Sequence, residues 1–459
     1  MGNLIHKSSV IQKQKPKLTG HLCIEEKDDK FLVYIKEYPV WAVVNWVGVM
    51  LLRLSNGKNT IGSIINTVSA LNNKTRTENE KDILNLFQYL ADICMIELAD
   101  GAPYNKYSPR IYQPFVIYLN ITNNCNLKCS YCYANAGTDR KNELTTEQIY
   151  TTLDSAAKIS KNVKINVSGG EPLLRADLWD IATKCRKLGF SPTLLTNGTL
   201  VTRENALKIK KHFDDVLISI DGGSAVNHDK LRGHGSFAKA LRGLNFLLDS
   251  GVKLRVGATI TNLNIDSIPK LLKIPGITPS MLTLNLLIGA GRGHDKKNLR
   301  PSNEEIFELF KKLEGNDGNV AGFLQLQPSK LKKGGHCRMG QNIISVDSNG
   351  DVFPCHTLHK DELLAGNVKE EPLHSIFAKS SILKKCRDLT VDKIEKCKDC
   401  ELKMFCAGGC RADAYVTEGN FTACSTYCDF LHSAIKTYMW KGAPRWPIVA
   451  ENNNSLVKK

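Results

Sequence analysis

Cysteine is the residue type whose spacing in this sequence is best suited to chemistry. Of the 15 cysteines in 459 residues, three fall in the segment 125–132 and nine in the segment 337–428. The other three stand alone: Cys23, Cys94 and Cys185. Cysteine at about 3% is too sparse for a disulfide scaffold. In a reducing compartment, cysteines grouped in this way are typical of metal ligands.

The first group has the spacing C-x3-C-x2-C and follows directly on the apolar, strand-like run 115–122. Three thiolates on one loop can hold three irons of a [4Fe–4S] cube, and the fourth iron then lacks a protein ligand. Structural clusters and zinc sites normally use four ligands, so three cysteines indicate an open coordination position. Part of a zinc site is the alternative.

The motif CNLKCSYC resembles the signature of radical S-adenosylmethionine (SAM) enzymes. The resemblance implies that Cys125, Cys129 and Cys132 hold a [4Fe–4S] cluster whose open iron is chelated by SAM. It also implies that an electron from the cluster cleaves SAM and releases a 5′-deoxyadenosyl radical. Tyr131 stands where the family has an aromatic residue near the adenine.

Two motifs at the ends of later predicted strands extend this resemblance. The sequence SGGEPLL places Gly169, Gly170 and Glu171 where the family receives the SAM ammonium. Glycines let the backbone approach closely, and a carboxylate complements the positive charge. The sequence SIDGG places Ser219 and Asp221 where family members contact SAM or flank its ribose.

A third stretch, HDKLRGHGSF, resembles the family's HDxxRGxGSF. By this resemblance Arg232 pairs with the SAM carboxylate, and a solvated or structural arginine is the alternative. The segment 196–198, Thr-Asn-Gly, matches a recurrent ending of the third strand and is predicted to form a turn.

The downstream cysteines, with C-x12-G-x4-C followed by C-x2-C-x5-C-x3-C, resemble the SPASM extension of peptide-modifying radical SAM enzymes. The resemblance implies two auxiliary [4Fe–4S] clusters. The first would be held by Cys337, Cys355 and Cys410, and the second by Cys397, Cys400, Cys406 and Cys428. Two cubes need eight thiolates, and Cys424 or Cys386 could supply the eighth. If neither does, one iron is open to a substrate thiolate; one or two structural zinc ions are the alternative.

The elements that must position these cysteines are predicted to form three domains. In residues 113–316, six apolar runs alternate with amphipathic helices, which predicts an α/β fold with a partial (β/α)6 TIM-like barrel. The predicted strands are 115–122, 163–169, 193–198, 216–222, 254–261 and 282–289, and the predicted helices include 146–159, 203–212 and 237–249. Residues 334–432 form the cysteine-rich iron–sulfur domain, and residues 99–112 read as a linker.

Residues 20–98 are predicted to form a winged-helix-like domain. Strands 21–26 and 31–37 flank a turn, a helix follows Pro39, another starts at Thr60, and a third spans 80–94. Asn45, Gly48, Gly57, Thr60 and Ile64 carry a resemblance to the peptide-recognition domain of enzymes that modify ribosomally made peptides. Such domains bind a leader peptide as an added strand. A DNA-binding winged helix is the alternative, since the net charge is +16. That charge would equally attract an acidic leader.

Together these resemblances imply a radical SAM/SPASM oxidoreductase that modifies a ribosomally synthesised peptide, with thioether formation as the first expectation. Carbon–carbon or carbon–oxygen cross-linking and a sulfatase-maturing type of oxidation are the alternative reactions. A zinc-stabilised nucleic-acid-binding protein is the non-enzymatic alternative. The expected partners are a precursor peptide with a leader and a small electron-donor protein, rather than nucleic acid or a membrane. The longest apolar stretch, residues 40–52, is too short to cross a bilayer, so we expect a cytoplasmic protein.

Overall fold

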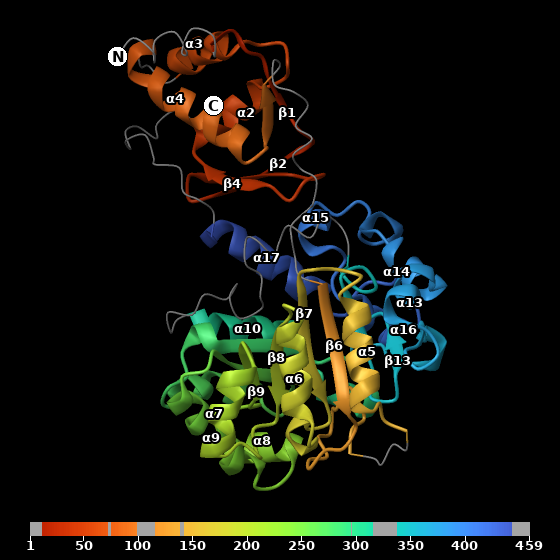
Figure 1. Cartoon of the computed structure of the whole chain (residues 1–459). Helices are drawn as coiled ribbons and strands as arrows, with labels where there is room; N and C mark the ends of the chain where they lie inside the picture. The colour runs from red at the N-terminus through yellow and green to blue at the C-terminus, as the bar shows by residue number, and fades with distance from the viewer. Residues whose placement is uncertain are drawn as a thin grey trace.

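The computed structural model describes residues 12–71, 75–98, 115–137, 142–294, 296–314 and 337–442. Its largest sheet has nine strands, in the order β11-β10-β9-β8-β7-β6-β12-β13-β14. A three-stranded sheet and a two-stranded sheet belong to a small N-terminal domain, drawn at the top of Figure 1.

Six strands of the large sheet pair in parallel in the order of the chain, as an α/β partial barrel requires. They are β6 (Phe115–Thr122), β7 (Val163–Gly169), β8 (Ser191–Thr196), β9 (Asp215–Ser219), β10 (Leu254–Ile260) and β11 (Leu282–Leu286). Their inward and outward faces are both largely buried, which explains their near-continuous apolar sequences. The predicted fold class is confirmed.

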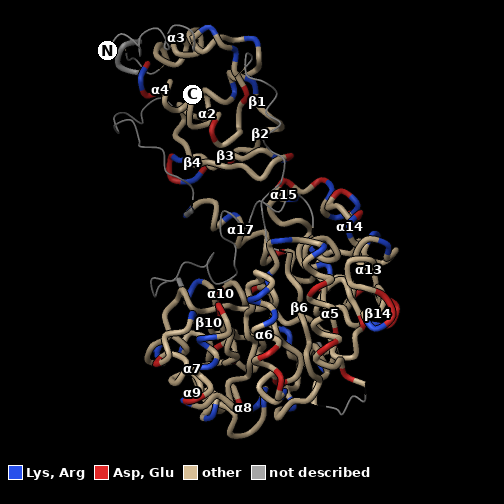
Figure 2. The backbone as a smooth tube through the Cα atoms, in the orientation of Figure 1, with Lys and Arg blue, Asp and Glu red and all other residues tan. Residues whose placement is uncertain are grey.

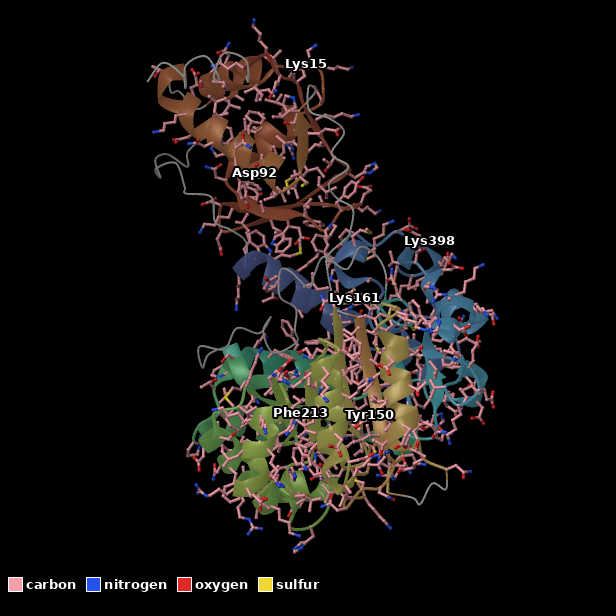
Figure 3. All side chains as sticks on the ribbon, in the orientation of Figure 1. Lys15, Asp92, Tyr150, Lys161, Phe213 and Lys398 are labelled. Carbon is pink, nitrogen blue, oxygen red and sulfur yellow. The ribbon has the colours of Figure 1, made fainter. Side chains whose placement is uncertain are left out.

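Helices cover the outer face of this sheet (Figure 1). They are α5 (Thr146–Ala156), α6 (Leu178–Lys187), α7 (Arg203–His212), α8 (Ala225–Arg232), α9 (Ser236–Ser250) and α10 (Asn303–Glu314). Thr145 and Thr202 each start a helix with a capping box, which satisfies the first backbone donors. Phe213 is 2% exposed and belongs to the core between helices and sheet, whereas Lys398 lies exposed on the C-terminal domain (Figure 3).

The connection from β10 to β11 differs from the other crossovers, because it contains a 3-10 helix, η2 (Ile265–Lys273). Pro269 lies inside it, and proline has no backbone N–H with which to continue an α-helix.

The barrel sheet continues into the C-terminal domain. Strand β12 (Ile343–Val346) pairs in parallel with β6, and β13 (Asp351–Phe353) and β14 (Gly366–Asn367) follow as antiparallel neighbours. The remaining helices are α13 (Leu373–Lys379), α14 (Ser381–Arg387), α15 (Lys403–Cys406), α16 (Arg411–Glu418) and α17 (Cys428–Gly442). Cys337 and Cys355 therefore flank strands that belong to the same sheet as the barrel.

The N-terminal domain contains the predicted hairpin and three helices. Strands β2 (Leu22–Lys27), β3 (Lys30–Ile35) and β4 (Trp41–Val44) form its antiparallel sheet, followed by α2 (Trp46–Leu54), α3 (Ile61–Leu71) and α4 (Arg76–Asp92). Asp28 and Asp29 both have positive φ, as the tight two-residue hairpin turn requires. The segment after Pro39 was predicted to be helical, but it first forms β4, because Trp41–Val44 pairs with β3. The helix begins only after Asn45, whose side chain accepts from the backbone N–H of Gly48.

Helix α17 joins the N-terminal domain to the rest of the molecule and lies between that domain and the barrel in Figure 1. The ring of Trp41 on β4 lies 5.8 Å from Phe405 and 6.1 Å from Tyr438, centroid to centroid. The ammonium of Lys436 lies 2.6 Å from the carboxylate of Glu25. The sheet of the N-terminal domain thus packs on the C-terminal domain.

Some elements extend beyond the domain boundaries expected from the sequence. Strand β1 (Pro16–Leu18) pairs with β5 (Ile96–Leu98), and α17 ends at Gly442. The boundaries 20–98, 113–316 and 334–432 stay predictions, and the expected linker 99–112 lies outside the described residues. Within the described ranges, no helix is long and apolar enough to span a bilayer.

Candidate active site

The loop with Cys125, Cys129 and Cys132 leaves the C-terminal end of β6, and all three side chains are half-buried. The pKa of the Cys125 thiol is raised to about 11, chiefly by burial and to a smaller extent by the neighbouring Glu171, Cys129 and Cys132, so these groups lie close together. No disulfide joins any cysteine in the part of the chain that the structure describes.

Arg292, which follows β11, binds the backbone of this cysteine loop. Its Nε donates to the carbonyl of Cys129 at 2.9 Å and its Nη1 to the carbonyl of Ala136 at 2.6 Å. A Cβ at the adjacent Gly291 would lie 2.3 Å from the carbonyl oxygen of Cys132, so glycine is needed for the contact. Sequence reasoning missed Arg292, because its partners lie more than 150 residues away.

Gly169 and Gly170 pack against the chain that leads into Cys125. A Cβ at Gly169 would lie 2.1 Å from the carbonyl oxygen of Thr122, and one at Gly170 would lie 2.0 Å from that of Asn124. Backbone bonds from Gly170 to Thr122 and from Glu171 to Asn124 close the contact, at 2.8 and 2.9 Å. The close packing of the ends of β6 and β7 therefore already requires glycine at both positions. The approach of these glycines to SAM stays a prediction.

Glu171 is fully buried, and three protein donors fix its carboxylate. Oε1 accepts from the hydroxyl of Thr196 at 2.8 Å and from the N–H of Leu173 at 3.1 Å. Oε2 accepts from the N–H of Asn197 at 2.8 Å. The turn predicted at 196–198 thus holds Glu171. Burial raises the pKa of Glu171 to about 7, against the lowering effect of these donors.

Arg232, Asp221 and Tyr131 form one buried network. Arg232 Nε donates to Asp221 Oδ2 at 2.5 Å, and its Nη2 donates to the Tyr131 hydroxyl at 2.8 Å. That hydroxyl in turn donates to Asp221. Arg232 Nη1 lies 4.0 Å from Cys129 Sγ. Arg232 is thus held by Asp221 and Tyr131 while its Nη1 faces the cysteine loop. Its pairing with the SAM carboxylate and a purely structural role both stay predictions.

The rest of the HDKLRGHGSF stretch builds the turn that carries Arg232. His228 Nδ1 accepts from the backbone N–H of Asp221 at 3.2 Å, and burial lowers the pKa of His228 to about 4. Asp229 accepts from the N–H groups of Gly235 and Phe237 at 2.7 and 2.8 Å, which starts α9. Ser219 ends β9 opposite Gly257 of β10, at the same strand end as Asp221.

The auxiliary cysteines separate into two groups. In the first group, Cys386 is buried in a small apolar cluster, and three half-buried cysteines pack against that cluster: Cys337, Cys355 and Cys410. The second group is made of cysteines whose thiols influence the pKa of Cys397 or of one another: Cys397, Cys400, Cys406, Cys424 and Cys428. The structure thus places Cys386 with the first group and Cys424 with the second.

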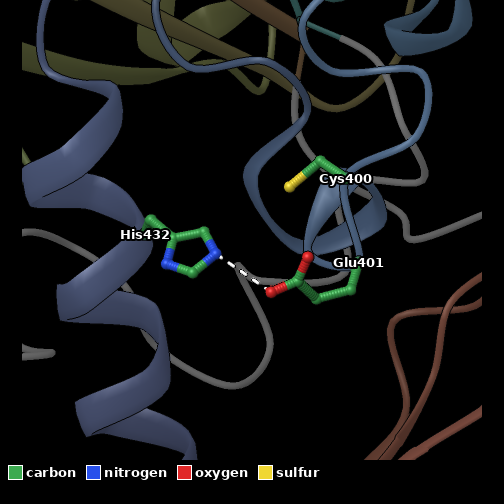
Figure 4. Close-up of side chains that lie close together, drawn as sticks. All are labelled: Cys400, Glu401 and His432. Atoms are coloured by element: carbon green, nitrogen blue, oxygen red, sulfur yellow. Dashed lines mark hydrogen bonds and ion pairs between the residues drawn. The ribbon is translucent and has the colours of Figure 1, made fainter.

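Cys400 of the second group lies close to Glu401 and His432 (Figure 4). Their ligand atoms lie within 4.8 Å of one another, and His432 Nε2 is 3.1 Å from Glu401 Oε1. Among the described residues, no other set of three such side chains is compact enough for a single metal ion. Sequence reasoning missed His432, whose signal is its place one turn after Cys428 on α17.

Comparison with known proteins agrees with this arrangement. Residues 119–274 match the model of the radical SAM superfamily, and residues 337–401 match that of the SPASM iron–sulfur cluster-binding domain. An AdoMet-dependent heme synthase from Methanosarcina barkeri is 31% identical over 69% of this chain and 96% of that protein. The chain belongs to the radical SAM/SPASM family. It is an α/β enzyme, and the zinc-stabilised nucleic-acid-binding alternative does not apply.

One further curated relative and two solved structures are also similar to this chain. The mycofactocin maturase MftC from Mycolicibacterium smegmatis is 28% identical over 66% of this chain and 80% of that protein. The structure of anSMEcpe with bound AdoMet has a TM-score of 0.60 at 20% identity, covering 72% of this chain and 99% of that one. Streptococcus suis SuiB bound to the precursor peptide SuiA has a TM-score of 0.54 at 15% identity, covering 89% of this chain and 98% of that one.

The cofactors of the family are SAM and a [4Fe–4S] cluster, and the SPASM match implies auxiliary clusters. The donor set of this radical SAM enzyme fits them. Half-buried thiols lie beside a buried carboxylate, Glu171, and a guanidinium, Arg232. These opposite charges suit the ammonium and the carboxylate of the amino-acid part of SAM.

Proposed function

We propose that this radical SAM/SPASM enzyme modifies a ribosomally synthesised precursor peptide and binds its leader on strand β2. The observation that carries the proposal is the N-terminal sheet, whose order is β2-β3-β4 and whose strand β2 has no second partner strand among the described residues. Strands β2 and β4 each pair with β3 alone among the described residues, and β4 makes the more extensive contact with α17, so we propose β2 as the edge that receives the leader. An unpaired strand edge offers backbone donors and acceptors to an added strand.

The extent of the fold shared with SuiB supports a peptide substrate. Residues 115–459 make up three quarters of the chain, so an alignment covering 89% of it extends into the first 114 residues. SuiB was solved with its precursor peptide. The N-terminal domain is thus part of a fold whose solved member holds a peptide.

Charge contributes less to this proposal than backbone pairing does. The net charge of +16 would favour an acidic leader, but β2 itself carries Glu25 and Glu26. Figure 2 shows basic and acidic residues scattered over all the domains, without one continuous basic stripe in that view. A phosphate-binding face would be more sharply basic.

At the barrel mouth, this chain's residues would hold and orient the cofactors. When bound, SAM and its cluster supply a 5′-deoxyadenosyl radical that abstracts hydrogen from the substrate. Cys125, Cys129 and Cys132 would bind the irons. The residues proposed to contact SAM are Tyr131, Gly169, Gly170, Glu171, Ser219, Asp221 and Arg232. Of these, Glu171 would accept from the ammonium, and Arg232 Nη1 would reach the carboxylate.

In the SPASM domain we propose two auxiliary clusters, the second held by Cys397, Cys400, Cys406 and Cys428 with Cys424 beside them. The product we propose is a thioether, in which the substrate carbon and the cysteine thiol each lose one hydrogen. The carbon would give its hydrogen atom to the 5′-deoxyadenosyl group, the thiol would give up a proton, and the remaining electron would pass to an auxiliary cluster as the carbon–sulfur bond forms. Carbon–carbon or carbon–oxygen linkage is the second choice among peptide reactions.

A porphyrin is the second candidate substrate, and one observation favours it. The AdoMet-dependent heme synthase of M. barkeri is the relative with 31% identity over 96% of its length. That alignment covers 69% of this chain, which the barrel and the C-terminal domain alone could provide. The N-terminal domain would then need another role.

Binding to β2 distinguishes the candidates. In a two-residue hairpin, hydrogen-bonded and non-hydrogen-bonded residue pairs alternate away from the turn, and the first pair, Lys27 with Lys30, is hydrogen-bonded. The next pair, Glu26 with Phe31, is not, so the N–H of Glu26 points away from β3. Glu26→Pro removes this outward donor without removing a bond to β3. The probe is a fluorescent synthetic peptide with the sequence of a short reading frame beside the gene. Loss of one backbone bond, together with the bulk of the ring, should weaken binding at least about fivefold.

Glu26→Ala is the matched control and should bind the peptide like the wild type. Equal affinity of the proline variant and the wild type would overturn leader docking on β2. The porphyrin probe is Fe-coproporphyrin III, which the name of a second M. barkeri relative, 31% identical over 70% of this chain, gives as that protein's product. Binding of Fe-coproporphyrin together with no binding of the peptide would favour the porphyrin candidate instead.

A further inference from the structure

Cys386 is a buried cysteine that no spacing pattern in the sequence assigns to a site. It lies on α14 and is 3% exposed. Its Cβ lies 2.9 Å from the position that a Cβ on Gly340 would occupy, so α14 packs directly on the segment that follows Cys337. Gly340 has a φ of 66°, which favours glycine at this contact.

Arg387, the next residue, fixes α14 in this position. Its Nη1 donates to the carbonyl of Gly340 and to the carbonyl of Phe377, both at 3.1 Å. The N–H of Gly340 donates to the carbonyls of Ile343 and Pro354, at 2.9 and 3.0 Å. Pro354 directly precedes Cys355. The turn at Gly340 therefore ties Cys386 to the backbone of both Cys337 and Cys355.

The neighbours of Cys386 are thiols. Cys337, Cys355 and Cys410 pack against the same apolar cluster that contains it. The pKa of Cys386 is raised to about 12, first by burial and then by the neighbouring Cys337 and Cys355. The same two cysteines add to the raised pKa of Cys410. Cys424 instead lies beside Cys428 and Cys397, in the second group.

A [4Fe–4S] cube takes four thiolates, and the family pattern gives the first auxiliary site three. We propose that Cys386 is the fourth protein ligand of the first auxiliary cluster. Its thiol gives up a proton when the thiolate binds iron. All four irons of that cluster then have a protein ligand, so none is open to a substrate thiolate. The cluster would serve electron transfer whether the substrate is a peptide or a porphyrin.

Cys185 provides a matched control, because it is 0% exposed and belongs to the main apolar core. It represents a buried cysteine that is only a small apolar side chain. Burial also raises the pKa of Cys185 to about 12, but none of the contributions comes from another cysteine. Neighbouring thiols, rather than burial, set Cys386 apart.

The test uses the full chain with Cys125, Cys129 and Cys132 replaced by alanine, so that only auxiliary clusters are loaded. Iron and sulfide per chain and the EPR spectrum of the reduced protein are measured with and without added 2-mercaptoethanol. The parent should hold about 8 irons, with a spectrum that the thiol leaves unchanged. Cys185→Ala should match the parent.

In that background, Cys386→Ala should either fall to about 4 irons or retain a cluster whose spectrum shifts when 2-mercaptoethanol occupies the vacated iron. Cys386→Ser keeps the size of the side chain and should retain a cluster with altered g-values. The proposal is overturned if the alanine variant keeps all its iron and a thiol-insensitive spectrum. It is equally overturned if the parent spectrum responds to the thiol, or if the serine variant has the parent's g-values.

Discussion

The ammonium of Lys436 on α17 lies 2.6 Å from the carboxylate of Glu25 on β2. The same ammonium is 3.0 Å from Glu401, which directly follows Cys400. One cation therefore connects the strand proposed to bind the leader with the segment proposed to hold the second auxiliary cluster. The cation also explains why Cys400, Glu401 and His432 need not bind a separate metal, since Glu401 is already paired with a positive charge.

Lys436→Met should loosen the contact between the N-terminal sheet and the C-terminal domain. Lys436 and Glu25 are a quarter to a third exposed, so the loss in stability should be modest, about 1 kcal/mol or less. Hydrogen exchange of the β2–β4 amides, which reports this loosening, should become faster. Lys239→Met, at an exposed site on α9, should leave it unchanged. Equal exchange rates in the two variants would argue against the bridge.

Arg232→Met should strongly destabilise the barrel, because it leaves the buried carboxylate of Asp221 without its cation. Breaking such a pair costs about 3–5 kcal/mol. The double variant Asp221→Asn/Arg232→Met should recover much of that loss, since neither charge is then buried alone. Urea unfolding of the cluster-free chain measures both. If the two single effects simply add in the double variant, the two residues are not coupled.

Glu171 predicts a pH dependence of stability in the cluster-free chain. Its pKa in the folded state is raised to about 7, above the usual value for a glutamate, so the folded state binds the proton more tightly. This group's contribution is therefore greatest below the unfolded pKa, and stability falls as the pH rises toward 7. At one pKa unit per 1.36 kcal/mol, the fall is roughly 3 kcal/mol. Glu171→Gln should flatten this slope, as followed by urea unfolding between pH 4.5 and 7.5; an unchanged slope would contradict the assignment.

Gly170→Ala should disrupt the cysteine loop, because its Cβ would lie 2.0 Å from the backbone carbonyl oxygen of Asn124 and backbone cannot easily move aside. The readout is the iron bound by the loop, measured against the auxiliary-only chain, and most of it should be lost. Gly189→Ala is the control: its Cβ would meet nothing within 4 Å, so only its φ of 74° costs stability, about 1–2 kcal/mol. Full iron loading of Gly170→Ala would refute the tight contact.

Local patterns predicted much of the fold. Strand β6 and helix α7 have the bounds expected from their apolar periodicity, because that signal lies within each segment. Strand β4 was missed, since Trp41–Val44 is apolar on every residue and only its pairing with β3 makes it a strand. The link from β6 to β12 was missed for the same reason: it joins segments more than 200 residues apart.

The candidate site was predictable where its residues form motifs. The cysteine loop and the segments 169–171 and 196–198 follow successive strands, and the parallel sheet brings these ends together. Arg292 and Cys386 belong to no spacing pattern, so their contacts appear only once the chain is folded. The sequence motif around Arg232 does not indicate that its Nε donates a hydrogen bond to Asp221, eleven residues earlier.

The proposal that this enzyme modifies a precursor peptide is tested by the reaction of the reconstituted enzyme with the peptide encoded by the neighbouring reading frame. Under reducing, anaerobic conditions with SAM, mass spectrometry follows the peptide while 5′-deoxyadenosine is quantified. We expect a peptide that has lost two hydrogens, with 5′-deoxyadenosine formed alongside it, and neither product with Cys129→Ala. An unmodified peptide, together with SAM-dependent conversion of Fe-coproporphyrin by the same preparation, would contradict the proposal.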